Sequence, residues 1–211
     1  MQFRDLKAQY QALKPEIDAG IAAVIDSSAF ILGKPVTELE NKLAEYVGRR
    51  YCVGCGNGTD ALQLALMIWG VGPGDAVFTS DFTYFASAGT SSILGATPVL
   101  VDIDLKTFNI SPEALEEQIK RVISEGKLKP KVIVTVDLFG LPANYPAIRK
   151  IADLYDKLIL EDGNQGFGGE IMGKKACSFG DISTTSFFPA NPLGCYGDDG
   201  ALFTDNDEWA A

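Results

Sequence analysis

Apolar and polar positions along the chain alternate between helix-like and strand-like patterns for most of its length. Apolar residues that recur every three to four positions indicate a helix, whereas a short continuous apolar run indicates a buried strand. The first pattern predicts helices over residues 6–25, 36–47, 59–69, 84–94 and 145–155, and another that opens at 111. The second predicts strands over residues 51–53, 76–79, 98–101, 132–136, 158–160, 184–187 and 201–203. We expect Pro15 to mark a break in the first helix.

This alternation of strands and helices predicts an α/β fold with three layers, α/β/α, around a mainly parallel sheet. No internal repeat, low-complexity tract or linker interrupts it. Residues 201–208 read as a strand that enters a new helix shortly before the last residue, Ala211. We therefore expect the sequence to be part of a longer protein.

The composition narrows the function classes. With 211 residues and 46% hydrophobic content, the chain can bury a sizeable core. Its 18 basic and 28 acidic residues give a net charge of −10, which repels a phosphate backbone and argues against a general nucleic-acid binder. No apolar stretch is long enough for a bilayer, and the N-terminus lacks the apolar core of a signal peptide. We expect a cytoplasmic protein with no membrane partner.

The sequence contains no histidine, which excludes Ser-His-Asp and Cys-His catalysis and histidine-containing zinc sites. Cys52 and Cys55 have the spacing of a redox or metal pair, but no second such pair completes a zinc site. We interpret them as small, buried, reduced residues at the end of a strand and expect no metal site.

Loops that follow the strands of a parallel sheet are where ligands bind. Residues 54–61 form a glycine-rich turn between a strand and a helix, where free N–H groups can attract an anion. On its own, a tight turn without a ligand explains this segment equally well. Asp162 follows a buried strand, where a carboxylate needs a cation, such as a protonated pyridine nitrogen, or several donors. A capping or turn aspartate is an equally good interpretation of Asp162 alone.

Two further segments carry candidate chemistry. Phe82, Tyr84 and Phe85 follow a predicted strand, and an aromatic side chain there can stack on a planar ring. We expect core packing for at least two of these three. Residues 186–200 form an unusual string with no obvious structural explanation.

Together these segments resemble the DegT/StrS family of sugar aminotransferases, which use pyridoxal phosphate. The matching segments are FILG (30–33), NGTDAL (57–62), GATPV (95–99), VDID (101–104), LFG (138–140), GKK (173–175), SFGD (178–181) and the run 186–200. The resemblance covers nearly the whole chain. It implies an aspartate-aminotransferase-like (fold type I) large domain at residues 36–211, after an N-terminal helix and substrate-side loop at 1–35. It also implies that the family's C-terminal small domain is absent.

The resemblance implies a role for each candidate site residue. Gly58 and Thr59, aided by Ser186, would hold the cofactor phosphate. Tyr84 would stack on the pyridine ring, Asp162 would pair with its nitrogen, and Gln165 would contact the ring hydroxyl. The family first converts pyridoxal 5′-phosphate to pyridoxamine 5′-phosphate with an amino donor, usually glutamate. It then passes the amine to a keto group of a nucleotide-linked sugar, in active sites at a homodimer interface.

The position of the family's catalytic lysine departs from this pattern. The family's Schiff-base lysine belongs between Ala190 and Pro192, and this chain has Asn191 there. An amide can neither form the covalent link nor move a proton, and loss of acid–base catalysis alone typically costs about 10²–10⁴-fold. The chain also has Gly163 and Asn164 where the family usually has alanines, and Asp199 where it usually has glycine.

Three hypotheses follow. The chain is a portion of a sugar aminotransferase, inactive as written because of Asn191 and truncation. Alternatively, it is a non-catalytic relative that binds pyridoxal or pyridoxamine phosphate. The third, which explains fewer residues, is a nucleotide-binding α/β domain.

Overall fold

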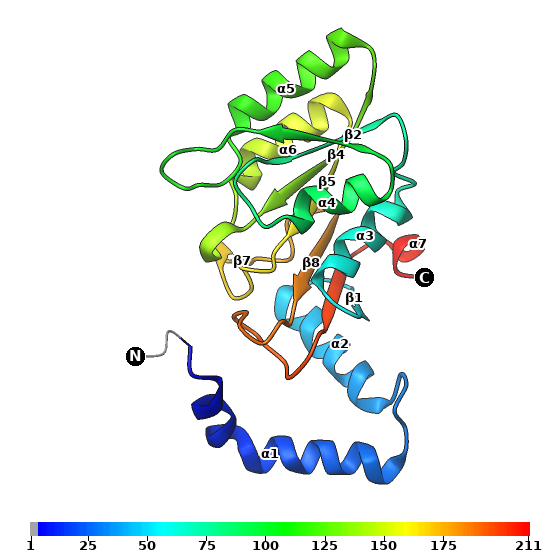
Figure 1. Ribbon diagram of the computed structural model, residues 1–211, viewed down its shortest axis with the longest axis vertical. Coiled ribbons are helices and arrows are strands. Elements are labelled where there is room, and N and C mark those ends of the chain that lie inside the picture. The colour runs from blue at the N-terminus through cyan, green and yellow to red at the C-terminus, as the bar shows by residue number, and fades with distance from the viewer. Residues whose placement is uncertain (1–3) are drawn as a thin grey trace.

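A mixed sheet of seven strands forms the centre of the computed structural model, which describes residues 4–211 (Figure 1). The strands are β1 (Tyr51–Cys55), β2 (Asp75–Ser80), β3 (Thr97–Val101), β4 (Lys129–Val136), β5 (Leu158–Asp162), β8 (Ile182–Ser186) and β9 (Gly200–Thr204). They lie in the order β1-β9-β8-β5-β4-β2-β3. β9 runs antiparallel to both of its neighbours, and the other pairs are parallel. A separate small hairpin pairs β6 (Glu170–Ile171) with β7 (Lys174–Lys175).

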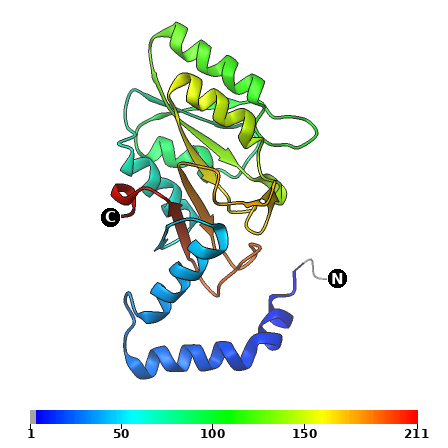
Figure 2. The same ribbon diagram turned by 180° about the vertical axis from the view of Figure 1, so that it is seen from behind.

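Helices cover both faces of this sheet (Figures 1 and 2). The helices of residues 4–211 are α1 (Leu6–Ser27), which lies apart from the sheet, α2 (Lys34–Val47), α3 (Gly58–Ile68), α4 (Ala86–Ile93), α5 (Pro112–Glu125), α6 (Tyr145–Tyr155) and α7 (Asp207–Ala210), with a short 3-10 helix η1 (Leu138–Gly140). α3 and α4 pack on one face, and α5 and α6 pack on the other. The α2 helix packs against the same face as α5 and α6, over β9. The predicted three-layer α/β/α fold around a mainly parallel sheet is confirmed.

The alternation of side chains along each strand produces the two halves of the core. On β4, Val132 and Val134 face α3, whereas Ile133 faces α5 and α6. On β2, Val77 likewise faces the α3 side of the sheet, and Phe78 faces the side of α5 and α6. Because both faces are covered, the central part of each of these strands is a run of apolar residues, which is why the strands could be found from the sequence.

Polar residues at helix starts explain why most helices begin where the pattern predicted. Ser111 accepts a hydrogen bond from the Ala114 N–H, and Asn144 caps α6 in the same way. The observed α6 has the bounds predicted for it. The strands extend beyond their predicted apolar runs, because flanking polar residues join the ladder.

The expected break at Pro15 is wrong, because α1 runs through it as one helix. Proline removes one N–H from the hydrogen-bond ladder, and α1 has no buried residue whose packing a local distortion could disturb. Figures 1 and 2 show α1 at one end of the molecule, apart from the sheet. A contact between the Tyr10 and Tyr196 rings, with centroids 5.8 Å apart, joins it to the rest.

The cysteines are free, as expected, but Cys52 and Cys55 are half-buried rather than buried. They lie on β1, which is an edge strand with a neighbour on one side only. Burial raises the pKa of the Cys52 thiol to about 12 and that of Cys55 to about 11. Within residues 4–211, no group of three or more potential ligands could hold a metal ion. No helix in that range combines the length and apolar character that crossing a membrane requires.

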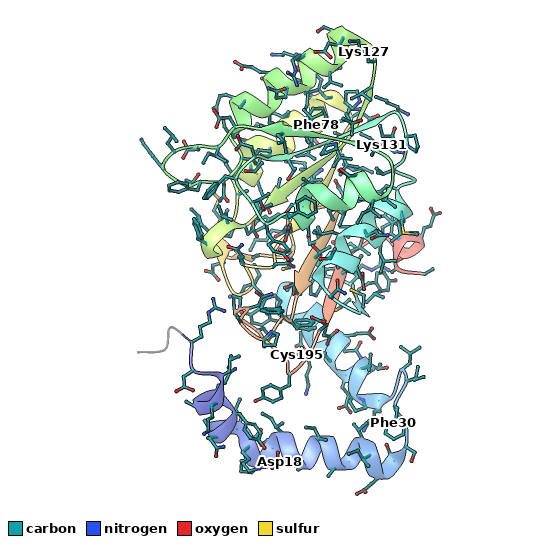
Figure 3. All side chains as sticks on the ribbon, in the orientation of Figure 1. Asp18, Phe30, Phe78, Lys127, Lys131 and Cys195 are labelled. Carbon is teal, nitrogen blue, oxygen red and sulfur yellow. The ribbon has the colours of Figure 1, made fainter. Side chains whose placement is uncertain are left out.

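Because Phe78 lies in the core and Leu105 does not, truncating each to alanine should lower the free energy of unfolding by different amounts. Phe78 is fully buried between the sheet and α5 (Figure 3), whereas Leu105 is 82% exposed. Phe78→Ala should lower the free energy of unfolding by about 3–5 kcal/mol, and Leu105→Ala should change it by less than about 0.5 kcal/mol. Urea unfolding measures both, and equal costs would contradict the core described here.

Candidate functional site

The loops at the carboxyl ends of the parallel strands enclose a cavity of about 620 Å³. All seven residues singled out from the sequence line it: Gly58, Thr59, Tyr84, Asp162, Gln165, Ser186 and Asn191. Asn57, Asp60, Val136, Asn164, Phe188 and Asp198 complete the lining. The cavity lies at the edge of the sheet where ligands bind in open α/β folds.

The glycine-rich turn forms one end of the cavity. Asn57 caps α3 by accepting a hydrogen bond from the Asp60 N–H at 2.8 Å. The N–H groups of Gly58 and Thr59, in the first turn, have no acceptor within the helix and are available to an anion.

Two glycines are required where this turn lies against β8 and β9, namely Gly58 in the turn and Gly200 on β9. A Cβ on Gly58 would lie 2.5 Å from the Ser186 Cβ, and one on Gly200 would lie 2.6 Å from the Asn57 carbonyl carbon. Only glycine lets the turn lie this close to β8 and β9. The turn therefore packs directly against β8 and β9, and the turn and the end of β8 line the same wall of the cavity.

A buried carboxylate lies at the end of β5. Asp162 is 3% exposed and accepts a hydrogen bond from the Ser87 hydroxyl at 2.7 Å. Its other oxygen has only a long contact, 3.4 Å, with the Asn164 N–H. Burial raises the pKa of this carboxyl. Since none of the described residues that line the cavity is a lysine or an arginine, Asp162 is suited to a cationic group on a ligand.

The Gln165 side chain is oriented by a hydrogen bond from η1. Its Oε1 accepts a hydrogen bond from the Phe139 N–H at 2.9 Å. Phe139 has a left-handed backbone, with φ 57°, which turns this N–H into place. The amide nitrogen of Gln165 remains free to donate to a ligand oxygen.

Asn191 is fixed by two hydrogen bonds in the loop after β8. Its Nδ2 donates to the Ser186 carbonyl at 2.9 Å, and its backbone N–H donates to Phe188 at 2.8 Å. The Ser186 hydroxyl oxygen accepts from the Phe188 N–H, so its proton is free to donate into the cavity. No amine nucleophile is present among the described lining residues.

The nearest lysines in the sequence do not take the place of Asn191. Lys175 pairs with Glu170 at 3.0 Å, and the Lys174 ammonium lies 5.2 Å from the centre of the Phe179 ring. Lys174 lines a different cavity, with Arg49 and Arg149.

The expectation of core packing for two of the three aromatics after β2 is wrong. Phe82 is 45% exposed, Tyr84 69% and Phe85 80%. They lie in and just after the loop beyond the end of the sheet, where neither helix layer covers them. Tyr84 reaches the cavity and presents a ring at its edge.

Comparison with known families identifies the chain's relatives. The model of the DegT/DnrJ/EryC1/StrS aminotransferase family matches residues 11–211. A Pseudomonas aeruginosa protein, UDP-2-acetamido-2-deoxy-3-oxo-D-glucuronate aminotransferase, is 49% identical over 210 residues, which are 100% of this chain and 56% of the relative. The chain spans about half the length of the curated relatives it matches.

Solved structures share the fold. A DegT DnrJ EryC1 StrS aminotransferase from Brucella abortus superposes with a TM-score of 0.98 at 47% identity, over 100% of this chain and 56% of that one. The NtdA protein of Bacillus subtilis, solved with bound cofactor PMP, gives a TM-score of 0.89 at 31% identity, over 100% of this chain and 46% of that one. These similarities confirm the aspartate-aminotransferase-like fold expected from the resemblance.

The close approach at Gly58 generates a prediction about stability. Gly58→Ala should lower the free energy of unfolding by about 1–3 kcal/mol, because the new methyl group overlaps the Ser186 side chain. Gly72→Ala is a matched control, since its Cβ would meet only the Leu94 carbonyl oxygen, at 3.9 Å. Chemical unfolding measures both, and a neutral Gly58→Ala would show that the turn does not lie against β8.

Proposed function

The chain belongs to the DegT/DnrJ/EryC1/StrS aminotransferase family, and from this premise we propose that its cavity holds pyridoxal or pyridoxamine 5′-phosphate without a covalent bond. We also propose that the chain as written does not catalyse transamination. One observation carries both statements. The cavity combines an anion-binding turn, a buried carboxylate and a free amide donor, but a fixed asparagine stands where the family has its lysine.

In this proposal the phosphate lies against the first turn of α3. The N–H groups of Gly58 and Thr59 donate to its oxygens, and the Thr59 and Ser186 hydroxyls add two further donors. Phosphate binding at a helix start needs no lysine or arginine. The acidic net charge of the chain is therefore compatible with an anion at this position.

Tyr84 and Asp162 would hold the cofactor's ring, Tyr84 by contact with its face. A protonated pyridine nitrogen would supply the cation that the buried Asp162 carboxylate lacks. The free amide nitrogen of Gln165 donates to the ring hydroxyl oxygen. When bound, the cofactor supplies an electron sink for amine chemistry, and the Asp162 charge strengthens it by keeping the ring nitrogen protonated.

Loss of activity follows from what the Asn191 side chain can do. An amide does not act as a nucleophile towards the cofactor's aldehyde, and it does not accept or release a proton near neutral pH. The residues that bind and orient the cofactor thus remain, whereas the group that moves the proton is missing. A nucleotide-binding α/β domain, the remaining alternative, gives no role to Asp162 and Gln165.

The substrates of the whole protein are part of the proposal. The similarity to the Pseudomonas aeruginosa enzyme supports a nucleotide-linked keto sugar as the amine acceptor. Glutamate is the proposed amino donor.

We propose a homodimer, with residues 1–35 as an arm and 36–211 as the cofactor-binding body. None of the α1 residues is buried, and its apolar Leu13, Ile21 and Ile25 are 45–59% exposed. Phe85 is also exposed beside the cavity. Apolar surface of this extent is usually covered by a partner.

Restoring the lysine tests the assignment of Asn191. After incubation with pyridoxal 5′-phosphate and borohydride, Asn191→Lys should gain the mass of one reduced cofactor that survives denaturation. The unaltered chain and Asn191→Gln should gain none. A stable adduct on the unaltered chain would mean that another lysine serves, and its absence from Asn191→Lys would contradict the alignment of this loop.

The oligomeric state is tested by sedimentation. The chain should sediment at twice its mass of 22.6 kDa, and Phe85→Asp should shift it towards the monomer. Leu154→Asp, at a residue 69% exposed on α6, is the control and should leave the dimer intact. A monomer at all concentrations would overturn the homodimer for this chain.

A further inference from the structure

Two buried carboxyl groups, those of Asp137 and Glu161, lie on the other side of the sheet from the cavity. β4 and β5 are paired with Thr135 opposite Glu161 and Val136 opposite Asp162. Val136 and Asp162 face the cavity. Because side chains alternate along a strand, Thr135, Asp137 and Glu161 face the opposite side. Asp137 and Glu161 are both fully buried.

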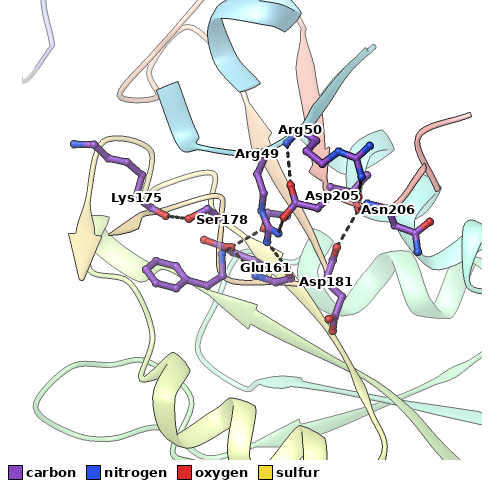
Figure 4. A network of polar contacts seen from close by, with 12 residues as sticks. Arg49, Arg50, Glu161, Lys175, Ser178, Asp181, Asp205 and Asn206 are labelled. Atoms are coloured by element: carbon purple, nitrogen blue, oxygen red, sulfur yellow. Dashed lines mark hydrogen bonds and ion pairs between the residues drawn. The ribbon is translucent and has the colours of Figure 1, made fainter. Parts of the chain in front are cut away.

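Glu161 has the surroundings of an ionised carboxylate. It accepts hydrogen bonds from the backbone N–H groups of Cys177, Phe179 and Gly180 at 2.5–3.0 Å and from the Ser183 hydroxyl at 2.7 Å. Figure 4 shows it within the network that includes Ser178 and Asp181. Four donors stabilise the charged form of a buried carboxyl.

Asp137 has different surroundings. Its Oδ1 accepts from the Tyr145 hydroxyl at 2.6 Å and from the Ala143 N–H at 3.1 Å. Its Oδ2 is buried and has no donor. Glu161 lies opposite Thr135, two residues before Asp137 on the same side of the sheet, and an ionised Glu161 offers only acceptor oxygens. Two neighbouring buried carboxylates with no cation between them do not both stay ionised. A proton on Asp137 turns this repulsion into a hydrogen bond to Glu161.

We propose that Asp137 is a neutral carboxylic acid that donates its proton to Glu161, and that this acid pair positions Asp162 and Gln165 from behind the sheet. The second part rests on the proposed function, since it concerns the cofactor cavity. The first part stands without it.

Short connections join the acid pair to the two cavity residues. The Asp137 N–H donates to the Asp162 carbonyl at 3.1 Å. Asp137 Oδ1 closes the loop that contains η1, whose Phe139 N–H holds Gln165. A Cβ on Gly166 would lie 2.4 Å from the Asp137 Cβ, so the segment after Gln165 packs directly on the aspartate. Asp137 therefore acts as a positioning residue.

The groups around Asp137 act in two directions. The Tyr145 hydroxyl and the Ala143 N–H donate to Asp137 and so favour its ionised form. Burial and the neighbouring carboxyl of Glu161 favour the neutral form, and they have the larger effect. Lys174 is exposed. Arg49 and Arg149 donate to the carbonyl groups of Gly180 and Phe179, and they pair with Asp205 and Asp181. Burial and the neighbouring Glu161 charge raise the pKa of Asp137.

The pH dependence of stability follows from this shift. An aspartate in the unfolded chain titrates near pH 4, at about 3.9. Since the native state binds the proton more tightly, the contribution of Asp137 is complete below that pH and is lost as pH rises through its native pKa. Asp137→Asn, which keeps the donor to Glu161 and the acceptor for Tyr145, has no such dependence.

Two measurements on the chain without cofactor test the acid pair. Infrared spectroscopy at neutral pH should show the carbonyl stretch of a protonated carboxyl that Asp137→Asn removes. Asp104→Asn, at an exposed aspartate whose pKa is lowered by the Thr107 and Lys106 N–H groups, should leave the stretch unchanged. From pH 5 upward, the unfolding constant of the unaltered chain should rise relative to that of Asp137→Asn by about tenfold per pH unit. A flat ratio, or a stretch that persists in Asp137→Asn, would overturn the shared proton.

The positioning role is tested by the dissociation constant for pyridoxamine 5′-phosphate. Asp137→Asn should bind within about twofold of the unaltered chain, and Asp137→Ala about tenfold more weakly, the loss expected when buried partners are orphaned. Equal binding by Asp137→Ala would overturn the role while leaving the shared proton standing. If the unaltered chain binds no cofactor, the proposed function fails, and the two cofactor-free measurements still decide the acid pair.

Discussion

Two consecutive carboxyl groups at the end of β5 determine what each face of the sheet holds at this edge. Asp162 points into the cavity, where its buried charge requires a cationic partner, and Glu161 points to the other side, where four donors surround it. Burial of either group without compensation costs several kcal/mol. A buried negative charge must be compensated. Segment 177–183 does this for Glu161 with four hydrogen-bond donors, and the proposed ligand would do it for Asp162.

In the proposed function, cofactor binding and catalysis depend on different parts of the cavity. The proposed phosphate site depends on backbone N–H groups and on the absence of side chains at Gly58 and Gly200, and neither feature involves Asn191. The ring end depends on Asp162 and Gln165, which are held by Ser87 and Phe139. The Asn191 side chain donates to the Ser186 carbonyl. In the proposed function, the cavity keeps the groups that recognise the cofactor but has an amide in place of a reactive amine.

The fold and the cavity residues could be predicted largely from the sequence, because both leave local signals. Buried parallel strands are continuous apolar runs, helix starts carry capping residues, and the family's motifs mark the loops at one edge of the sheet. The predictions that were wrong concern the burial of side chains, which depends on contacts between residues far apart in the sequence. Exposure of Phe82 and Phe85 depends on where the helix layers end, and the half-burial of Cys52 depends on β1 lying at the sheet's edge. The placing of Asp137 and Glu161 on the same side of the sheet depends on the register between β4 and β5, which no sequence motif signals.

The position of the cofactor in the cavity is tested most directly by a crystal structure of the chain grown with pyridoxamine 5′-phosphate. We expect phosphate density at the N–H groups of Gly58 and Thr59 and the ring nitrogen within hydrogen-bond distance of Asp162, with no density joining the ligand to the protein. A phosphate bound elsewhere, or a ring turned so that its nitrogen faces away from Asp162, would contradict this position.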